Sequence, residues 1–333
     1  MDSFNIINPF TKETLASHPY EQPKTIEEKI AKLEHEFKKK APIEHTKQRL
    51  NQLSQTLDQH KQTIATLIST DMGKPITESI KEVQKCMDCC DYYEENAETI
   101  QKKQRSMNHI QEPLGIILGI MPWNYPLWQI IRYLIPSIVV GNACLVKPAF
   151  NTYRIAEQLA TFFHDIHWPI MAIAMPTDAE TETLIGHKKI AGVSFTGSVT
   201  TGQIVGQLAT KHLKPCVLEL GGSDPFIVFK DANIDTAIDH AIKARFTNAG
   251  QVCIAAKRFL FEDSIYNKAL SQFKEKTMNF LKYGNPLDET TTIGPIARKD
   301  LKNIIPLMRQ HWHALWLGIF ILNVWVLTYM NRI

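Results

Sequence analysis

The first candidate for covalent chemistry in this chain is Cys253, which ends the segment Gly-Gln-Val-Cys at residues 250–253. A cysteine that forms a covalent adduct needs a partly exposed, polar setting, because the thiolate is the nucleophile. Gly250 would leave room for a substrate to approach the backbone. The pattern is weak by itself, since a lone cysteine is more often a small buried hydrophobic residue than a catalyst.

A second candidate is Glu219, which ends an apolar stretch and is followed by Leu220, Gly221 and Gly222. A carboxylate in this place can act as a general base that a water molecule reaches. It can equally be an ordinary carboxylate at the end of a strand, before a turn. The residues alone leave both interpretations open.

A third candidate is Asn124, which lies between Pro122 and Pro126 and follows the apolar stretch 116–121. Pro126 suits the first turn of a helix. Asn124 could cap that helix. Its side-chain amide could instead donate a hydrogen bond to an oxyanion that develops during a reaction.

A candidate anion site lies in residues 195–202, Phe-Thr-Gly-Ser-Val-Thr-Thr-Gly, after another apolar stretch. Gly197 and Ser198 would form a turn that opens a helix. Free N–H groups and the helix dipole favour an anion at such an N-terminus. The pattern is not the G-x-G-x-x-G of a Rossmann fingerprint, and an ordinary strand–turn–helix would have the same appearance.

Short apolar stretches and helical stretches alternate from residue 115 onward, which predicts an α/β fold with a mainly parallel sheet. In such sheets ligands bind at the carboxyl ends of the strands, where Asn124, Ser198 and Glu219 would lie; Cys253 instead follows a helical stretch. Residues 25–105 are polar, with apolar residues at helical spacing, and predict two or three amphipathic helices. The expected strands are 116–121, 143–146, 171–175, 191–195, 216–218 and 226–229.

The bulk composition limits the function classes. A chain of 333 residues is long enough for two domains, and 44% hydrophobic with 21% charged residues is ordinary for a soluble globular protein. A net charge of +3 does not imply a nucleic-acid partner. The N-terminus does not have the pattern of a signal peptide.

The cysteines favour a reducing cytoplasm over a disulfide framework, because six in this length are too few for one. Cys86, Cys89 and Cys90 include a C-x-x-C spacing that invites a metal interpretation. No second pair lies at a suitable distance, and the surrounding sequence is helical. We therefore expect no metal site and a cytoplasmic location.

Together, these motifs form a series that resembles the aldehyde dehydrogenase superfamily. The series is Gly-Ile-Met-Pro-Trp-Asn-Tyr-Pro-Leu, then Gly-Asn, Val-Lys-Pro, Phe-Thr-Gly-Ser, Leu-Glu-Leu-Gly-Gly and Gly-Gln-Val-Cys. The resemblance covers about residues 5–308. Residues 219–224 and 250–259 most resemble the short bacterial succinate-semialdehyde dehydrogenases that use NAD or NADP.

The resemblance implies a mechanism. Cys253 as a thiolate attacks the aldehyde carbon, and the side-chain amide of Asn124 and the Cys253 N–H stabilise the oxyanion. Such preorganised donors are often worth about 3–4 kcal/mol each. Hydride then passes to the nicotinamide. Glu219 activates the water that hydrolyses the resulting thioester.

The resemblance also implies the cofactor site. Lys147 corresponds to the lysine at the adenosine ribose, Ser198 to the serine near the pyrophosphate, and Trp123 lines the cofactor cleft. Phe150 stands where the family often has a glutamate that grips the ribose hydroxyls, and this change favours NADP. The full implied set is Trp123, Lys147, Gly197, Ser198, Gly202 and Gly221.

Substrate selection is assigned to Arg132, eight residues after Asn124. Succinate-semialdehyde enzymes of this superfamily place an arginine there for the substrate carboxylate. A planar guanidinium suits a carboxylate through paired hydrogen bonds. The alternative is a helix arginine that pairs with an internal acid.

The resemblance implies a Rossmann-like cofactor domain at residues 1–221 and an incomplete α/β catalytic domain at 222–308. A possible oligomerisation hairpin lies near 104–113, since family members are homo-oligomers. The apolar tail 309–333 does not resemble the family, and the late Glu-x-Phe-Gly-Pro and Phe-Gly-Gly segments are missing. We interpret the tail as out-of-frame translation; a membrane anchor or an unfamiliar genuine ending are the alternatives.

A shortened chain of this kind would expose apolar faces that the missing part covers, and burial of apolar surface is the main term that holds a fold. We therefore expect poor folding, little turnover and doubtful oligomerisation. The alternative function is a non-catalytic remnant that binds nucleotide or a homologous subunit.

Overall fold

The computed structural model describes residues 2–102, 112–301 and 323–326, which fall into two compact units. The first unit consists of Met1–Asn8, Lys12–Asp71 and Ser79–Leu220. The second consists of Pro9–Thr11, Met72–Glu78 and Gly221–Ile333. Two short N-terminal segments therefore belong with the C-terminal part of the chain.

The first unit contains, in its described part, a five-stranded parallel sheet in the order β5-β4-β3-β6-β7. The chain adds β4 and β5 on one side of β3 and then returns to add β6 and β7 on the other. The predicted Rossmann-like α/β fold is thereby confirmed, with its topological switch point between β3 and β6. The strands are β3 (Ile116–Ile120), β4 (Ala143–Lys147), β5 (Met171–Ile173), β6 (Ile190–Thr196) and β7 (Cys216–Glu219).

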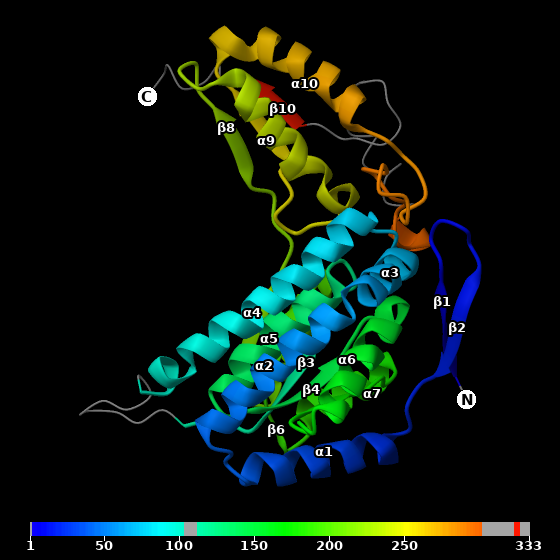
Figure 1. The fold of residues 1–333 in the computed structure, drawn as a ribbon, viewed down its shortest axis with the longest axis vertical. Helices are drawn as coiled ribbons and strands as arrows, with labels where there is room; N and C mark the ends of the chain where they lie inside the picture. The colour runs from blue at the N-terminus through cyan, green and yellow to red at the C-terminus, as the bar shows by residue number, and fades with distance from the viewer. Residues whose placement is uncertain (1, 103–111, 302–322, 327–333) are drawn as a thin grey trace. The chain divides into compact units, whose positions relative to one another are not determined.

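Helices pack on both faces of this sheet (Figure 1). One face carries α1 (Pro23–Lys38), α7 (Asp178–Gly186) and α8 (Val199–Lys211). The other face carries α5 (Pro126–Val139) and α6 (Tyr153–Asp165). The helix α2 (Ile43–Gln59) packs against both α5 and α6. The remaining elements of this part are α3 (Lys61–Met72), α4 (Ile76–Lys102) and the 3-10 turn η1 (Phe150–Thr152).

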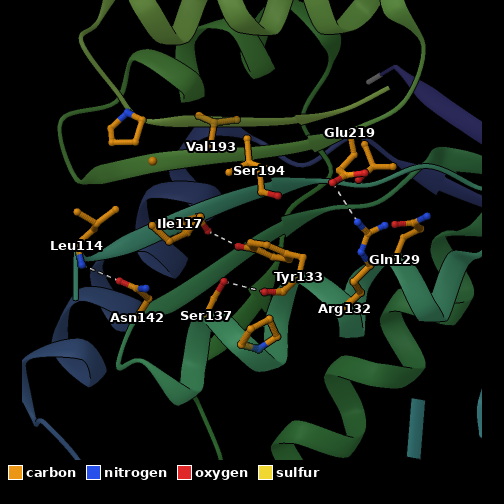
Figure 2. A pocket seen from close by; sticks show the side chains of 15 residues that line it. Leu114, Ile117, Gln129, Arg132, Tyr133, Ser137, Asn142, Val193, Ser194 and Glu219 are labelled. Atoms are coloured by element: carbon orange, nitrogen blue, oxygen red, sulfur yellow. Dashed lines mark hydrogen bonds and ion pairs between the residues drawn. The ribbon is translucent and has the colours of Figure 1, made fainter. Parts of the chain in front are cut away.

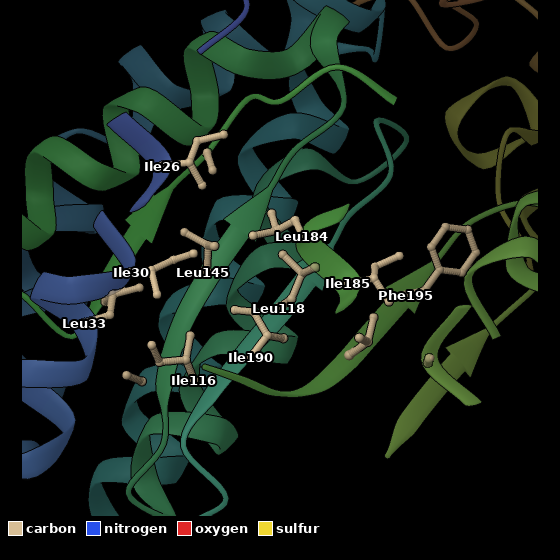
Figure 3. Close-up of a cluster of buried hydrophobic side chains, with 14 of the residues drawn as sticks. Ile26, Ile30, Leu33, Ile116, Leu118, Leu145, Leu184, Ile185, Ile190 and Phe195 are labelled. Atoms are coloured by element: carbon tan, nitrogen blue, oxygen red, sulfur yellow. The ribbon is translucent and has the colours of Figure 1, made fainter. Parts of the chain in front are cut away.

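The core of the first unit explains why its central strands β3 and β4 are mainly apolar. Strands covered on both faces bury every side chain, and the first four residues of β3 and of β4 are buried. On α1, the helical spacing of Ile26, Ile30 and Leu33 puts all three on the face that meets the sheet. Figure 3 shows this cluster, in which the labelled side chains are Ile26, Ile30, Leu33, Ile116, Leu118, Leu145, Leu184, Ile185, Ile190 and Phe195.

The N-terminal region differs from the expectation in two respects. The described residues of the region 25–105 form four helices, α1 to α4, where two or three were predicted. An antiparallel hairpin of β1 (Ser3–Ile7) and β2 (Thr14–Pro19) precedes them and was not predicted. Only Phe4 and Ile6 of β1 are buried, so its hydrophobic signal is too short to stand out.

The second unit contains a parallel sheet in the order β10-β9-β8. Its core joins Phe259 and Phe261 of β9 to Phe246 of α9 and Phe273 of α10. The elements are β8 (Pro225–Val228), α9 (Ile234–Phe246), η2 (Thr247–Gly250), β9 (Arg258–Phe261), η3 (Asp263–Ile265), α10 (Tyr266–Phe280) and β10 (Asn323–Val326).

Two predictions fall largely outside the described residues. They are the hairpin near 104–113 and the tail 309–333, of which the structure describes only residues 112–113 and the strand β10. Within the described ranges, none of the helices has both the length and the apolar character that crossing a membrane requires.

A buried ion pair ties α3 to α6. Arg154 donates from Nε to Asp71 Oδ1 at 3.0 Å, and its Nη2 contacts the same carboxylate. The side chain of Asp71 is fully buried. Burial raises the pKa of Asp71, and the hydrogen bonds and charge of Arg154 oppose that rise.

We predict that Arg154→Met destabilises the protein by about 3–5 kcal/mol, because it leaves a buried carboxylate without its cation. Without Arg154 the pKa of Asp71 rises further, so the carboxyl becomes neutral at a higher pH. The loss in the free energy of unfolding should therefore be smaller at mildly acidic pH than at neutral pH. Urea unfolding at the two pH values measures this, and an equal loss at both would contradict it. The double variant Asp71→Asn/Arg154→Met should recover part of the stability.

Candidate active site

The loop after β3 carries Trp123 and Asn124 at the carboxyl edge of the sheet. Asn124 Oδ1 accepts a hydrogen bond from the Tyr125 N–H at 3.1 Å, and Tyr125, not Asn124, is the N-cap residue of α5. Pro126 is the first residue of that helix, as predicted. The interpretation of Asn124 as a helix cap is therefore wrong, and its role as an oxyanion donor remains a prediction.

The N-terminus of α5 is satisfied instead by Glu82 of α4. Its Oε1 accepts hydrogen bonds from the N–H groups of Leu127 and Trp128, both at 3.0 Å. Glu82 is only 2% exposed. A buried carboxylate is thus held at the positive end of a helix, where the dipole favours a negative charge. This contact anchors α4 to the helix that follows the Asn124 loop.

Lys147 ends β4, next to β3, with its side chain partly buried. Burial lowers the pKa of Lys147, and the negative charge of Asp178 opposes that shift. Asp178 is the first residue of α7, where Thr177 and Glu180 form a capping box. A long cation at the end of a strand, close to the switch point, can reach a ligand bound at this edge.

The turn between β6 and α8 carries the candidate anion site. Ser198 is the N-cap of α8, and its Oγ accepts from the Thr201 N–H at 3.2 Å. A side chain on Gly202 would collide with Leu220, so glycine lets α8 pack close to the chain that follows β7. The structure thus gives Gly202 a packing role, while its contact with a cofactor remains a prediction.

These groups fit a dinucleotide at the switch point of the sheet. The first turn of α8 presents backbone N–H groups and a helix dipole to a pyrophosphate. Lys147 supplies a cation from the neighbouring side of β3. Gly197 and Ser198 leave the approach to the helix without a bulky side chain. The residues present are therefore suited to NAD or NADP.

A cavity of about 350 Å³ lies in the first unit against α5, β3, β6 and β7 (Figure 2). Arg132 and Glu219 both line it, and Arg132 Nη2 lies 3.1 Å from Glu219 Oε1. Their side chains are 41% and 49% exposed. Arg132 therefore pairs with an acid, as the alternative interpretation required, but that acid is the proposed general base.

Cys253 and Gly221 belong to the second unit. Cys253 is partly exposed in a turn before β9. It follows three successive residues with left-handed φ angles: Asn248 (52°), Ala249 (55°) and Gly250 (75°). Such a conformation costs energy for a non-glycine residue and persists only where the surroundings impose it.

Hydrogen bonds hold this strained turn. The Asn248 N–H donates to Glu78 Oε2 at 2.8 Å, and the Gln251 side chain donates to the Asn248 carbonyl at 3.1 Å. Gln251 Oε1 accepts from the Ala297 N–H at 3.0 Å. The backbone that leads into Cys253 is therefore fixed from three parts of the second unit.

Among the other cysteines, Cys89 and Cys216 are partly exposed like Cys253, and three are buried. Cys86, Cys90 and Cys144 are buried, and burial raises the pKa of Cys144 to about 12. Burial also raises the pKa of Cys89 to about 11. Cys86, Cys89 and Cys90 all lie on α4, and the described residues contain no cluster of three potential metal ligands.

The sequence matches the model of the aldehyde dehydrogenase family over residues 1–308. It is 37% identical to the succinate semialdehyde dehydrogenase [NAD(P)+] Sad of Escherichia coli (strain K12), over 89% of this chain and 66% of that protein. It is 35% identical to the succinate-semialdehyde dehydrogenase [NADP(+)] of Deinococcus radiodurans, over 88% and 64%. The chain thus spans about two thirds of the length of these relatives.

The fold is similar to that of a succinic semialdehyde dehydrogenase from Streptococcus pyogenes, whose crystal structure contains NADP+. The TM-score is 0.87 at 27% identity, and the alignment covers 96% of this chain and 75% of that one.

Sequence reasoning missed Glu82, Glu78 and Lys257. The two glutamates were hidden among many charged residues of the helical region, and only packing shows which of them turn inward. Lys257, whose Nζ donates to the Cys253 carbonyl at 2.8 Å, had a weak signal in the sequence: it follows Cys253 by four residues and can therefore fold back on the same turn.

We predict that Glu82→Ala lowers the free energy of unfolding by about 1–3 kcal/mol, because it leaves two N–H groups at the start of α5 without their acceptor. Glu82→Gln keeps an acceptor oxygen and should cost less. Chemical unfolding measures both. The control is Glu95→Ala, an exposed position on the same helix, which should have little effect; a similar loss in the control would refute the assignment.

Proposed function

The chain belongs to the aldehyde dehydrogenase family, and from this membership we propose that it oxidises an aldehyde to its carboxylic acid through a thioester on Cys253. The observation that carries the proposal is the accessibility of the reacting groups. Glu219 is half-exposed beside a cavity, and Cys253 is partly exposed after a turn of left-handed residues; Cys89 and Cys216 are also partly exposed but lie on a helix and a strand, and the other three cysteines are buried.

In the proposed reaction, the thiolate of Cys253 attacks the aldehyde carbon and the carbonyl electron pair moves to oxygen. The Asn124 amide and the Cys253 N–H donate hydrogen bonds to that oxyanion. When bound, the nicotinamide supplies the hydride acceptor that converts the adduct to a thioester. Glu219 takes a proton from water, the water oxygen attacks the thioester carbon, and the carbon–sulfur bond breaks to release the acid and the thiolate.

The proposed cofactor is NAD or NADP. Lys147 and the N-terminus of α8 supply the positive groups that a pyrophosphate and a ribose phosphate require. Phe150, in η1, lies three residues after Lys147 and is 38% exposed. A carboxylate at this position would repel a 2′-phosphate, so the phenyl ring supports the use of NADP.

The proposed substrate is succinate semialdehyde, and Arg132 would bind its carboxylate. The names of the similar proteins and the position of Arg132 in the cavity support this choice. A substrate carboxylate that takes the Nη2 donor of Arg132 would displace Glu219 from it. That exchange would free the Glu219 carboxylate for general-base work, so substrate binding and activation of the base would be coupled.

The alternative is a non-catalytic protein that binds nucleotide or a homologous subunit. It is favoured by apolar surface on and before β7, where Val217, Leu218 and Leu213 are 59%, 39% and 92% exposed. A protein of this kind would bind NADP without reducing it.

We predict that the purified chain reduces NAD or NADP only slowly when succinate semialdehyde is added, as expected for a shortened chain, and that Cys253→Ser abolishes this residual activity because a hydroxyl cannot replace the thiolate. Absorbance of the reduced nicotinamide is the measurement, and calorimetry with NADP reports cofactor binding separately. Cys216→Ser, at another partly buried cysteine, should retain the activity. Cofactor binding without any reduction would favour the non-catalytic alternative.

We predict that Arg132→Lys raises the KM for succinate semialdehyde by about tenfold or more, because a paired charged hydrogen bond is lost. The KM for butanal, an uncharged aldehyde of the same length, should change little. Arg49→Lys on α2, where Arg49 bonds Gln52 at 2.8 Å, is the control. Equal changes for both aldehydes would rule out a carboxylate-binding role.

A further inference from the structure

Lys257 joins two loops of the second unit through its ammonium group. Its Nζ donates to the carbonyl oxygen of Cys253 at 2.8 Å and also to that of Gly222. The next residue, Arg258, donates from Nε to the Ser223 carbonyl at 2.7 Å. The turn that carries Cys253 is thereby held to Gly222 and Ser223 in the loop before β8.

The contact with the Cys253 carbonyl constrains the nucleophile itself. Fixing that carbonyl fixes the rotation of the peptide that follows Cys253, and so restricts the direction in which its side chain leaves the backbone. On the preceding side, the strained residues Asn248 to Gly250 already fix the chain. Lys257 therefore completes the restraint on Cys253 from the C-terminal side.

The charged groups around Lys257 are Arg245, Asp224 and Cys253. Burial and the positive charge of Arg245 lower the pKa of Lys257, and the charges of Cys253 and Asp224 oppose that shift. Arg245 donates to the Ala256 carbonyl at 3.2 Å and packs against Gly250. Both cations are thus directed at the backbone of the turn 250–257.

We propose that Lys257 is a positioning residue for Cys253, which holds the turn of the nucleophile and supplies positive charge at its backbone carbonyl. The inference rests on the proposed role of Cys253 as the nucleophile. The two hydrogen bonds of Lys257 provide the positional part. Its ammonium provides the electrostatic part, since a cation close to the cysteine attracts an anionic reagent.

The test is alkylation of Cys253 in the purified 333-residue chain by iodoacetate, which is anionic, and by iodoacetamide, which is neutral. In both reactions the sulfur–carbon bond forms as iodide leaves, so only the charge of the reagent differs. Peptide mapping by mass spectrometry measures the rate at Cys253 separately from the other cysteines. The ratio of the two rates within one variant does not depend on how much protein is active.

We expect Lys257→Met to lower the iodoacetate-to-iodoacetamide ratio at Cys253 by about five- to tenfold, the size expected for the loss of one nearby charge. Lys257→Arg should retain most of the ratio, because it keeps the charge. Lys268→Met, at an exposed position on α10, should not change it.

The results test two assignments separately: Lys257 as the positioning residue and Cys253 as the nucleophile. An unchanged ratio in Lys257→Met, with Cys253 still reactive, overturns the role of Lys257 alone. An unreactive Cys253 in the unaltered chain overturns the nucleophile assignment, and the inference with it. Alkylation of buried Cys144 would show that a variant has unfolded. If Lys257→Met unfolds, the iodoacetate-to-iodoacetamide ratio is measured in Lys257→Gln, which keeps a hydrogen-bond donor without the charge. An unchanged ratio in Lys257→Gln overturns the proposal.

Discussion

Parallel pairing of β3 to β7 is the constraint on which the first unit depends. Because these strands run in one direction, every segment that follows a strand lies at the same edge of the sheet. Asn124, Lys147, Ser198 and Glu219 all belong to segments at strand ends, so residues spread over almost a hundred positions share one edge. Parallel strands need helices on their faces, and this requirement explains the apolar strands and the amphipathic α1.

Within that arrangement, Arg132, the proposed carboxylate-binding residue, forms an ion pair with Glu219, the proposed general base. An arginine and a carboxylate lining one cavity satisfy each other when no substrate is present. A second carboxylate that approaches Nη2 of Arg132 would compete with Glu219 for that donor. The cost of breaking the first ion pair is modest, because both side chains are about half-exposed and solvent screens their attraction. The guanidinium of Arg132 is thereby suited to exchanging one carboxylate partner for another.

The second unit positions its cysteine by a different method. The left-handed residues Asn248 and Ala249 store conformational strain, which Glu78 and Gln251 offset through hydrogen bonds. Lys257 fastens the other end of the turn. A cysteine on a loop is held here by several directional contacts to the backbone, in place of the regular hydrogen bonding that a helix or strand would provide.

The sequence alone determined the strand–helix alternation, the positions of β3 to β8 and the family, because apolar stretches and local motifs are properties of neighbouring residues, whereas it missed β1, β2 and β9. It could not decide the partner of Arg132, the acceptor at the start of α5 or the contact of Lys257 with Gly222, since these join residues from 35 to 87 positions apart. Many charged residues could have filled each of these roles. Only the packing of the elements selects one of them, because a hydrogen bond or an ion pair depends on direction and on distances of about 3 Å.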